Sequence, residues 1–142
     1  MKLIISTIVG FLVLFLLGWL FYGILFAKYL EVAYGDIARP MASFRMWAII
    51  VANLLQALLI SLIYSKFFNK GGSPAGQGFT CGIWLGFYSS IPYIFYMYAS
   101  MQISNWQAII VDAVIIGFMT LLATIGIALV YGQKKEQPAT GA

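Results

Sequence analysis

A single carboxylate, Asp112, lies inside an apolar stretch from Trp106 to Tyr131 that is longer than a membrane is thick. It follows the start of that stretch by about two helical turns, a depth at which an ionised group is costly without a partner. Acids in such positions either join polar networks between helices or serve as ligand and proton sites. Both interpretations of Asp112 stay open at the level of the sequence.

Other reactive side chains are few. The chain has no histidine and one cysteine, Cys81. A histidine-based triad, histidine-ligated haem, the common zinc sites and an intrachain disulfide are therefore all excluded. One carboxylate among apolar helices also leaves conventional acid–base catalysis without its second group. We expect a protein that is not an enzyme and that has neither a metal site nor a cofactor.

Polar residues on three other stretches lie at a depth close to that of Asp112. Counted from the outer end of each helix at about 1.5 Å per residue, Asn53, Tyr93 and Tyr22 reach a layer about 8–11 Å inside the boundary. In a dry layer Asp112 would be a neutral donor to Asn53 or Gln56, whereas a cation reaching down from the rim would preserve its charge. The candidate polar pocket comprises Asp112, Asn53, Gln56, Tyr93, Ser90, Tyr22 and Arg45.

The elements that position these groups follow from composition. Hydrophobic residues make up 63% of the 142 residues and charged ones 8%, against about 25% charged in soluble chains. Four stretches reach the roughly 20 apolar residues that a spanning helix needs. We predict an all-α membrane protein, an antiparallel bundle of four transmembrane helices over about 3–27, 46–66, 79–100 and 106–131. Residues 1–132 form the transmembrane domain, and 133–142 form a flexible cytoplasmic tail.

Two of these helices have distinct faces. In the stretch 46–66, Asn53 and Gln56 share a stripe that should hydrogen-bond to other helices, because lipid offers amides no partner. In the stretch 106–131, Asp112 lies on a face of smaller residues, which should contact protein. The opposite, bulky face is expected to contact lipid and contains Val111, Val114, Phe118, Leu121, Leu122, Ile125 and Leu129.

Gly82 and Gly86 form a Gly-x-x-x-Gly pair in the stretch 79–100. Small residues at this spacing allow two helix backbones to approach closely. The pair predicts a helix-packing face for another helix of this chain or of a second copy. Besides the lipid bilayer, the expected partner is therefore a second copy or a larger membrane complex.

Basic residues indicate the orientation of such a bundle, because cytoplasmic loops carry an excess of them. With four spans, five basic residues share the side of both termini and three lie on the other, which favours cytoplasmic termini. The two groups are Lys2, Lys66, Lys70, Lys134 and Lys135 on the first side and Lys28, Arg39 and Arg45 on the second. Because these residues stand at helix ends and form no patch, the net charge of +4 predicts no nucleic-acid partner.

The end of the first stretch resembles a bacterial family of small four-helix membrane proteins that is catalogued as a domain of unknown function. That family has an aromatic-Tyr-Gly-Pro-Leu-Phe run followed by a basic residue. The matching positions are Phe21, Tyr22, Gly23, Leu25, Phe26 and Lys28. The chain departs from the pattern at Ile24, where the family usually has proline. The resemblance implies the fold and a location in the bacterial inner membrane, but no activity.

Two functions are compatible with these features. The first is a non-enzymatic accessory or small-molecule-binding subunit with a polar layer around Asp112. The alternative is a small proton-coupled secondary transporter that uses Asp112. Small multidrug exporters have a similar number of spans and one critical acid, but that acid lies in the first helix, where this chain has none.

Overall fold

The computed structural model describes residues 1–35, 37, 45–100 and 105–132. The predicted tail, 133–142, and the basic residues Arg39, Lys134 and Lys135 lie outside this part of the chain. Within the described residues all regular secondary structure is helical, which confirms the all-α prediction. The elements are α1 (Lys2–Leu20), the π-helix η1 (Phe21–Leu25), α2 (Ala27–Tyr34), α3 (Met46–Ile63), the π-helix η3 (Tyr64–Phe68), α4 (Pro74–Ser100) and α5 (Trp106–Tyr131).

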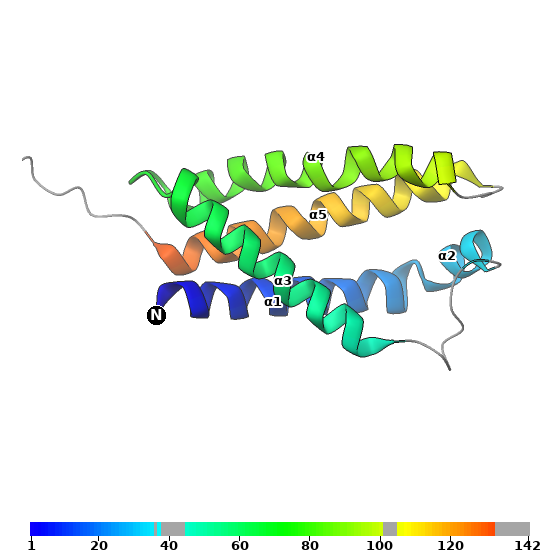
Figure 1. Ribbon diagram of the computed structural model, residues 1–142, viewed down its shortest axis with the longest axis horizontal. Helices are drawn as coiled ribbons and strands as arrows, with labels where there is room; N and C mark the ends of the chain where they lie inside the picture. The colour runs from blue at the N-terminus through cyan, green and yellow to red at the C-terminus, as the bar shows by residue number, and fades with distance from the viewer. Residues whose placement is uncertain (36, 38–44, 101–104, 133–142) are drawn as a thin grey trace, which may run out of the picture.

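Helix α5 lies at the centre of the arrangement. Both α1 and α4 pack along it, while α3 packs across α1, and the short α2 lies at one end (Figure 1). Consecutive long helices run in alternating directions (Figure 1). The beginning of α1 therefore meets the end of α5, where Lys2 Nζ donates a hydrogen bond to the Tyr131 carbonyl at 2.8 Å.

Three helical segments are long and apolar enough to cross a membrane: Lys2–Leu25, Met46–Phe68 and Trp106–Tyr131. This result confirms that the chain suits a membrane. Helix α4 has 27 residues and no charged side chain, but it is less apolar than the other three. Its glycine, serine and tyrosine residues lower the hydropathy. Of these, Gly78, Gly82, Gly86 and Ser90 pack against α5.

Small residues on α4 bring its backbone close to α5. A Cβ atom built on Gly78 would lie 2.6 Å from Ala128 Cβ, and one on Gly86 would lie 3.1 Å from the Gly117 carbonyl oxygen. Gly82 faces Leu121 in the same way, with 3.0 Å from its added Cβ to Leu121 Cα. The face with Gly82 and Gly86 is thus occupied by a helix of the same chain.

This packing corrects one expectation about α5. Leu121 was expected to contact lipid, but it packs against Gly82, and the Ile125 backbone packs against Gly78. The reason is that α5 is flanked on two sides, by α1 and by α4. Val114, Phe118 and Leu129 are exposed, as a lipid-facing surface requires.

The element boundaries differ from expectation at two places. Helix α2 occupies the beginning of residues 28–45, which lie between the first two predicted helices and were therefore expected to form a loop. Its sequence, Ala-Lys-Tyr-Leu-Glu-Val-Ala-Tyr, contains neither glycine nor proline. Helix α4 begins at Pro74 rather than near Phe79, because proline is well suited to the first turn of a helix. Pro92 lies inside α4 without ending it.

Candidate functional site

Asp112 is held between two tyrosines from different elements. Its side chain is 7% exposed. Tyr22 Oη donates a hydrogen bond to Asp112 Oδ1 at 2.5 Å, and Tyr93 Oη donates one to Asp112 Oδ2. Each carboxylate oxygen therefore has its own donor, one from η1 and one from α4. These bonds link α5 to both of the helices that flank it.

The π-helix η1 determines where Tyr22 points. The Phe26 amide donates to the Phe21 carbonyl at 2.8 Å, which closes a wider turn than that of an α-helix. Such single π turns insert one extra residue into a helix and are frequent at functional sites. Four of the six positions that carry the family resemblance, Phe21, Tyr22, Gly23 and Leu25, belong to this turn.

A third tyrosine, Tyr34 at the end of α2, lies at the same end of the bundle. Its hydroxyl is buried and has no hydrogen-bond partner among the described residues. It lies beside Tyr93 and interacts electrostatically with Asp112. Burial raises the pKa of Tyr34 to about 12, and the nearby Asp112 charge contributes to the rise. Tyr34 is therefore a protonated phenol at neutral pH.

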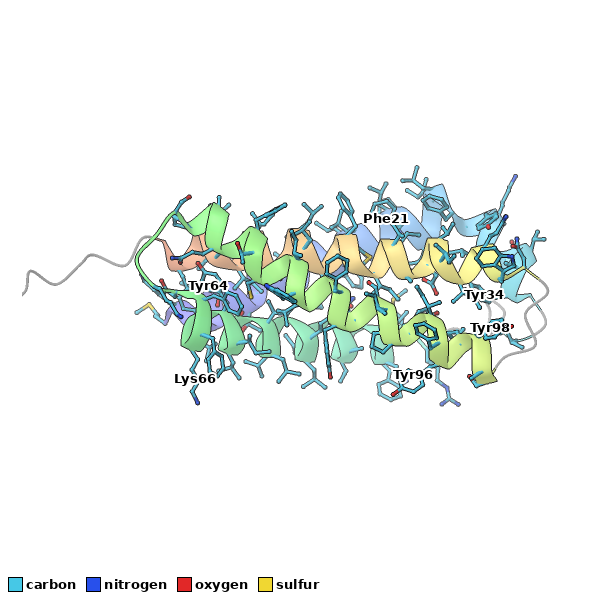
Figure 2. The ribbon with its side chains drawn as sticks, turned by 90° about the horizontal axis from the view of Figure 1, so that it is seen from above. Phe21, Tyr34, Tyr64, Lys66, Tyr96 and Tyr98 are labelled. Carbon is cyan, nitrogen blue, oxygen red and sulfur yellow. The ribbon has the colours of Figure 1, made fainter. Side chains whose placement is uncertain are left out.

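Reasoning from the sequence missed this role of Tyr34, because it treated residues 28–45 as a loop. The run of helix-forming residues from Ala27 to Tyr34 was the available signal. Figure 2 shows Tyr34 and Tyr98 at one end of the bundle, with Tyr64 and Lys66 at the other.

A cavity of about 150 Å³ lies next to the Asp112 cluster, on the side of α3. Its lining comes from α1, η1, α3 and α5 and consists of Leu14, Tyr22, Asn53, Gln56, Ile116 and Met119. Gln56 Nε2 donates to Thr120 Oγ1 at 3.3 Å, and Thr120 Oγ1 donates to the Ile116 carbonyl at 2.8 Å. Tyr22 is shared, since it lines the cavity and also binds Asp112.

The other predicted pocket residues, Asn53, Gln56, Ser90 and Arg45, form no hydrogen bond with Asp112 in the described part of the chain. Asn53 and Gln56 line the cavity, and neither bonds to Asp112. Ser90 is buried next to Gly117, and its hydroxyl has no partner among the described residues. Arg45 is exposed at the N-cap of α3, and no contact with Asp112 is formed. Asp112 is thus bonded by two tyrosines, and the structure realises neither of the two environments considered for it, a bond to Asn53 or Gln56 and a cation from the rim.

A larger cavity, of about 450 Å³, lies at the opposite end of the bundle. Its lining residues come from η3, the segment after it and the first turns of α4, and they are Phe67, Phe68, Lys70, Gly76, Gln77 and Thr80. The Gln77 amide fits best with its nitrogen donating to the Phe68 carbonyl at 2.9 Å and its oxygen accepting from the Gly72 amide at 2.7 Å. These bonds fix the connection between η3 and α4.

Among the described residues, no three histidine, cysteine or acidic side chains gather in a way that could hold a metal ion. No family model, curated protein or solved structure matches the chain. The resemblance to the family of unknown function stays a prediction, and the geometry around Asp112 is the feature that bears on function.

Proposed function

We propose that the chain is a multi-pass integral membrane protein that binds a small molecule beside Asp112, as a non-enzymatic accessory or binding subunit. One observation carries this proposal. A buried carboxylate, bonded by tyrosines from two elements, adjoins a cavity whose wall contains Tyr22, Asn53 and Gln56. Ligand sites in proteins are typically apolar cavities with a few placed polar groups, as here.

The arrangement of Asp112 favours binding over acid–base catalysis. Both of its oxygens accept a tyrosine hydrogen bond, and the chain has no histidine that could act as a second acid–base group. The carboxylate therefore holds the helices in position around the cavity. A proton-transfer role would require a group that exchanges its proton with a substrate.

The proposal includes four membrane spans. Helix α4 is about 40 Å long at 1.5 Å per residue, which exceeds the hydrocarbon thickness of about 30 Å. It has no charged residue and packs along α5, a segment that qualifies as a span. The excess of lysine on the side of the termini favours cytoplasmic ends in the inner membrane.

Reporter fusions test this topology. Green fluorescent protein attached after residue 142 should fluoresce, because it folds in the cytoplasm, whereas alkaline phosphatase attached there should be inactive. Alkaline phosphatase inserted after Ser100 should be active, since that point lies between α4 and α5 on the other side. The opposite pattern of activities would contradict the orientation, and the same activity at both points would contradict the crossing of α5.

The binding proposal is tested by gentle extraction followed by native mass spectrometry. We expect the wild-type protein to retain a small molecule that Gln56→Leu loses, because the variant removes an amide from the cavity wall. Gln107→Leu is the matched control, since Gln107 is exposed on α5. Equal spectra of the wild-type protein and Gln56→Leu would contradict the proposal.

The alternative, a proton-coupled transporter, is favoured by one feature. Asp112 accepts bonds from η1 and from α4, so its protonation would weaken the links to two helices at once. In liposomes with a trapped pH dye and an imposed pH gradient, a transporter should collapse the gradient faster than protein-free liposomes. Asp112→Asn should abolish the difference. A rate equal to that of protein-free liposomes would exclude this alternative.

A further inference from the structure

The size of the cavity beside Tyr22 limits what it can hold. A cavity of about 150 Å³ lined by apolar residues accepts a molecule the size of benzene, and the present cavity has this volume. Leu14, Ile116 and Met119 form its apolar part. A compact body of about one six-membered ring therefore fits.

The charges around the cavity point to a neutral occupant. None of its lining residues is ionisable at neutral pH, because Asp112 lies behind Tyr22 and does not line the wall. A charged molecule would lose its hydration without gaining a counter-ion in contact, which costs several kcal/mol. A neutral molecule avoids this cost.

The polar groups of the wall favour an occupant that donates hydrogen bonds. Tyr22 donates its hydroxyl hydrogen to Asp112. Toward the cavity, the Tyr22 hydroxyl oxygen can therefore only accept a hydrogen bond. Gln56 uses its nitrogen on Thr120, which leaves its carbonyl oxygen as an acceptor. Asn53 forms no hydrogen bond with another described residue and offers both an acceptor and donors.

All residues that line the cavity belong to segments that are apolar enough to cross a membrane. Helix α3 packs on α1 and makes only sparse contact with α5, and it diverges from α4 toward the end that carries α2 (Figure 1). In the proposed topology the segments that line the cavity are surrounded by the bilayer, which again favours a neutral molecule.

We infer that this cavity binds a ring-sized neutral alcohol or phenol that partitions into the membrane and donates its hydroxyl hydrogen to the wall. The inference rests on the proposed function, because it names the class of molecule that the binding site would take. It assigns Asn53 and Gln56 to ligand recognition and Tyr22 to the link between ligand and acid.

Ligand-observed fluorine NMR with 4-fluorophenol and fluorobenzene tests this inference on the full chain in nanodiscs, with empty nanodiscs as the reference for partitioning. We expect 4-fluorophenol to bind saturably and at least about tenfold more tightly than fluorobenzene.

Variants of the wall test the same preference. Asn53→Leu should make the affinities for the two probes equal, and Ile116→Phe should abolish binding of both by filling the cavity. Gln107→Leu should match the wild-type protein. Melting temperatures establish that each variant is folded, and Asn53→Gln, which keeps the amide, should retain the preference for the phenol.

Equal affinities of the two probes for the wild-type protein, or no saturable binding of 4-fluorophenol, would overturn the inference. A molecule retained in mass spectrometry without binding of 4-fluorophenol would overturn the ligand class and leave the proposed function standing. Binding of 4-fluorophenol without any retained molecule would support the ligand class and the binding site, and would contradict only the expectation that a ligand stays bound through extraction.

Discussion

Tyrosine is well suited to holding a carboxylate inside an apolar bundle. Its ring packs against apolar neighbours, while its hydroxyl reaches past the backbone of its own helix to a partner on another. Tyr22 and Tyr93 approach Asp112 in this way from opposite sides. Hydrogen bonds to a charged group contribute about 1.5–3 kcal/mol each to stability, so the cluster is a main determinant of how the three helices fit together.

Removing either hydroxyl should destabilise the protein. Tyr22→Phe and Tyr93→Phe each leave one oxygen of a buried carboxylate without its donor, and we expect each to lower the free energy of unfolding by about 1–3 kcal/mol. Denaturant unfolding in detergent micelles, followed by circular dichroism, measures the change. Tyr88→Phe is the control, because the Tyr88 side chain is 78% exposed. Equal effects of all three substitutions would contradict the role of the cluster.

Tyr34 makes stability depend on alkaline pH. Its pKa is raised from 10.0 to about 12, so the unfolded chain loses this proton at a lower pH than the folded chain does. The stability that Tyr34 contributes is therefore complete below pH 10 and is lost as pH rises toward 12. The difference in melting temperature between the wild-type protein and Tyr34→Phe should therefore decrease as the pH rises from 10 to 12. A constant difference from pH 8 to 12 would contradict this, and Tyr98→Phe controls for removal of an exposed hydroxyl.

Counting depth along the sequence predicts the layer of Asp112, Tyr22 and Tyr93, because helical rise is nearly constant. It does not predict which side chains touch. Helical phase gives the side on which a residue lies, but contact also depends on tilt, on the π turn at η1 and on side-chain length. Asn53 lies in the expected layer, and the longer Tyr22 reaches Asp112 instead.

At the scale of elements, the contact between α4 and α5 is the closest in the bundle. Its basis is a repeat of small residues every four positions on α4, at Gly78, Gly82, Gly86 and Ser90. Ser90 continues the face by packing on Gly117. The sequence predicted a close-packing face at Gly82 and Gly86, but not the helix that covers it, since periodicity does not identify a partner.

Gly78→Ala should separate the two helices locally. The added methyl would lie 2.6 Å from Ala128 Cβ and 3.0 Å from Ile125 Cα, and no side-chain rotation relieves these contacts. We expect the free energy of unfolding to fall by about 1–3 kcal/mol, as for other overpacked sites.

Gly76→Ala is a matched control two residues away, where the atom nearest to the added Cβ is 3.8 Å distant. It should be neutral or should stabilise the helix by about 0.5–1 kcal/mol, because alanine favours helix more than glycine does. Equal melting temperatures for the two variants would contradict the proposed packing.

For the whole molecule, the central position of α5 explains why its two faces differ less than its sequence indicates. Leu121 and Ile125 are as bulky as lipid-facing residues usually are, and hydrophobicity alone does not distinguish a lipid neighbour from a glycine-rich helix. Composition therefore predicted the all-helical fold and three segments that are apolar enough to cross a membrane. The order of packing around α5 depended on contacts between distant residues.

The reactivity of the single cysteine, Cys81, reports on this packing. Cys81 lies on α4, is fully buried and belongs to the cluster that includes Tyr64 and Ile127. Alkylation by a maleimide should be at least about tenfold slower at Cys81 than at the neighbouring position in Thr80→Cys/Cys81→Ala, because Thr80 is exposed. Mass spectrometry of the reacted protein gives both rates. Equal alkylation rates at the two positions would contradict the burial of Cys81 against Tyr64 and Ile127.

In the four-span topology proposed above, the modest hydropathy of α4 has a consequence for how the chain would enter the membrane during synthesis. A segment rich in glycine, serine and tyrosine leaves an insertion channel for lipid less readily than one rich in leucine and isoleucine. Helix α4 is synthesised before α5, the helix on which it packs most closely. We therefore expect α4 to stay at the insertion site until α5 emerges, so that the last two helices enter the bilayer together as a hairpin.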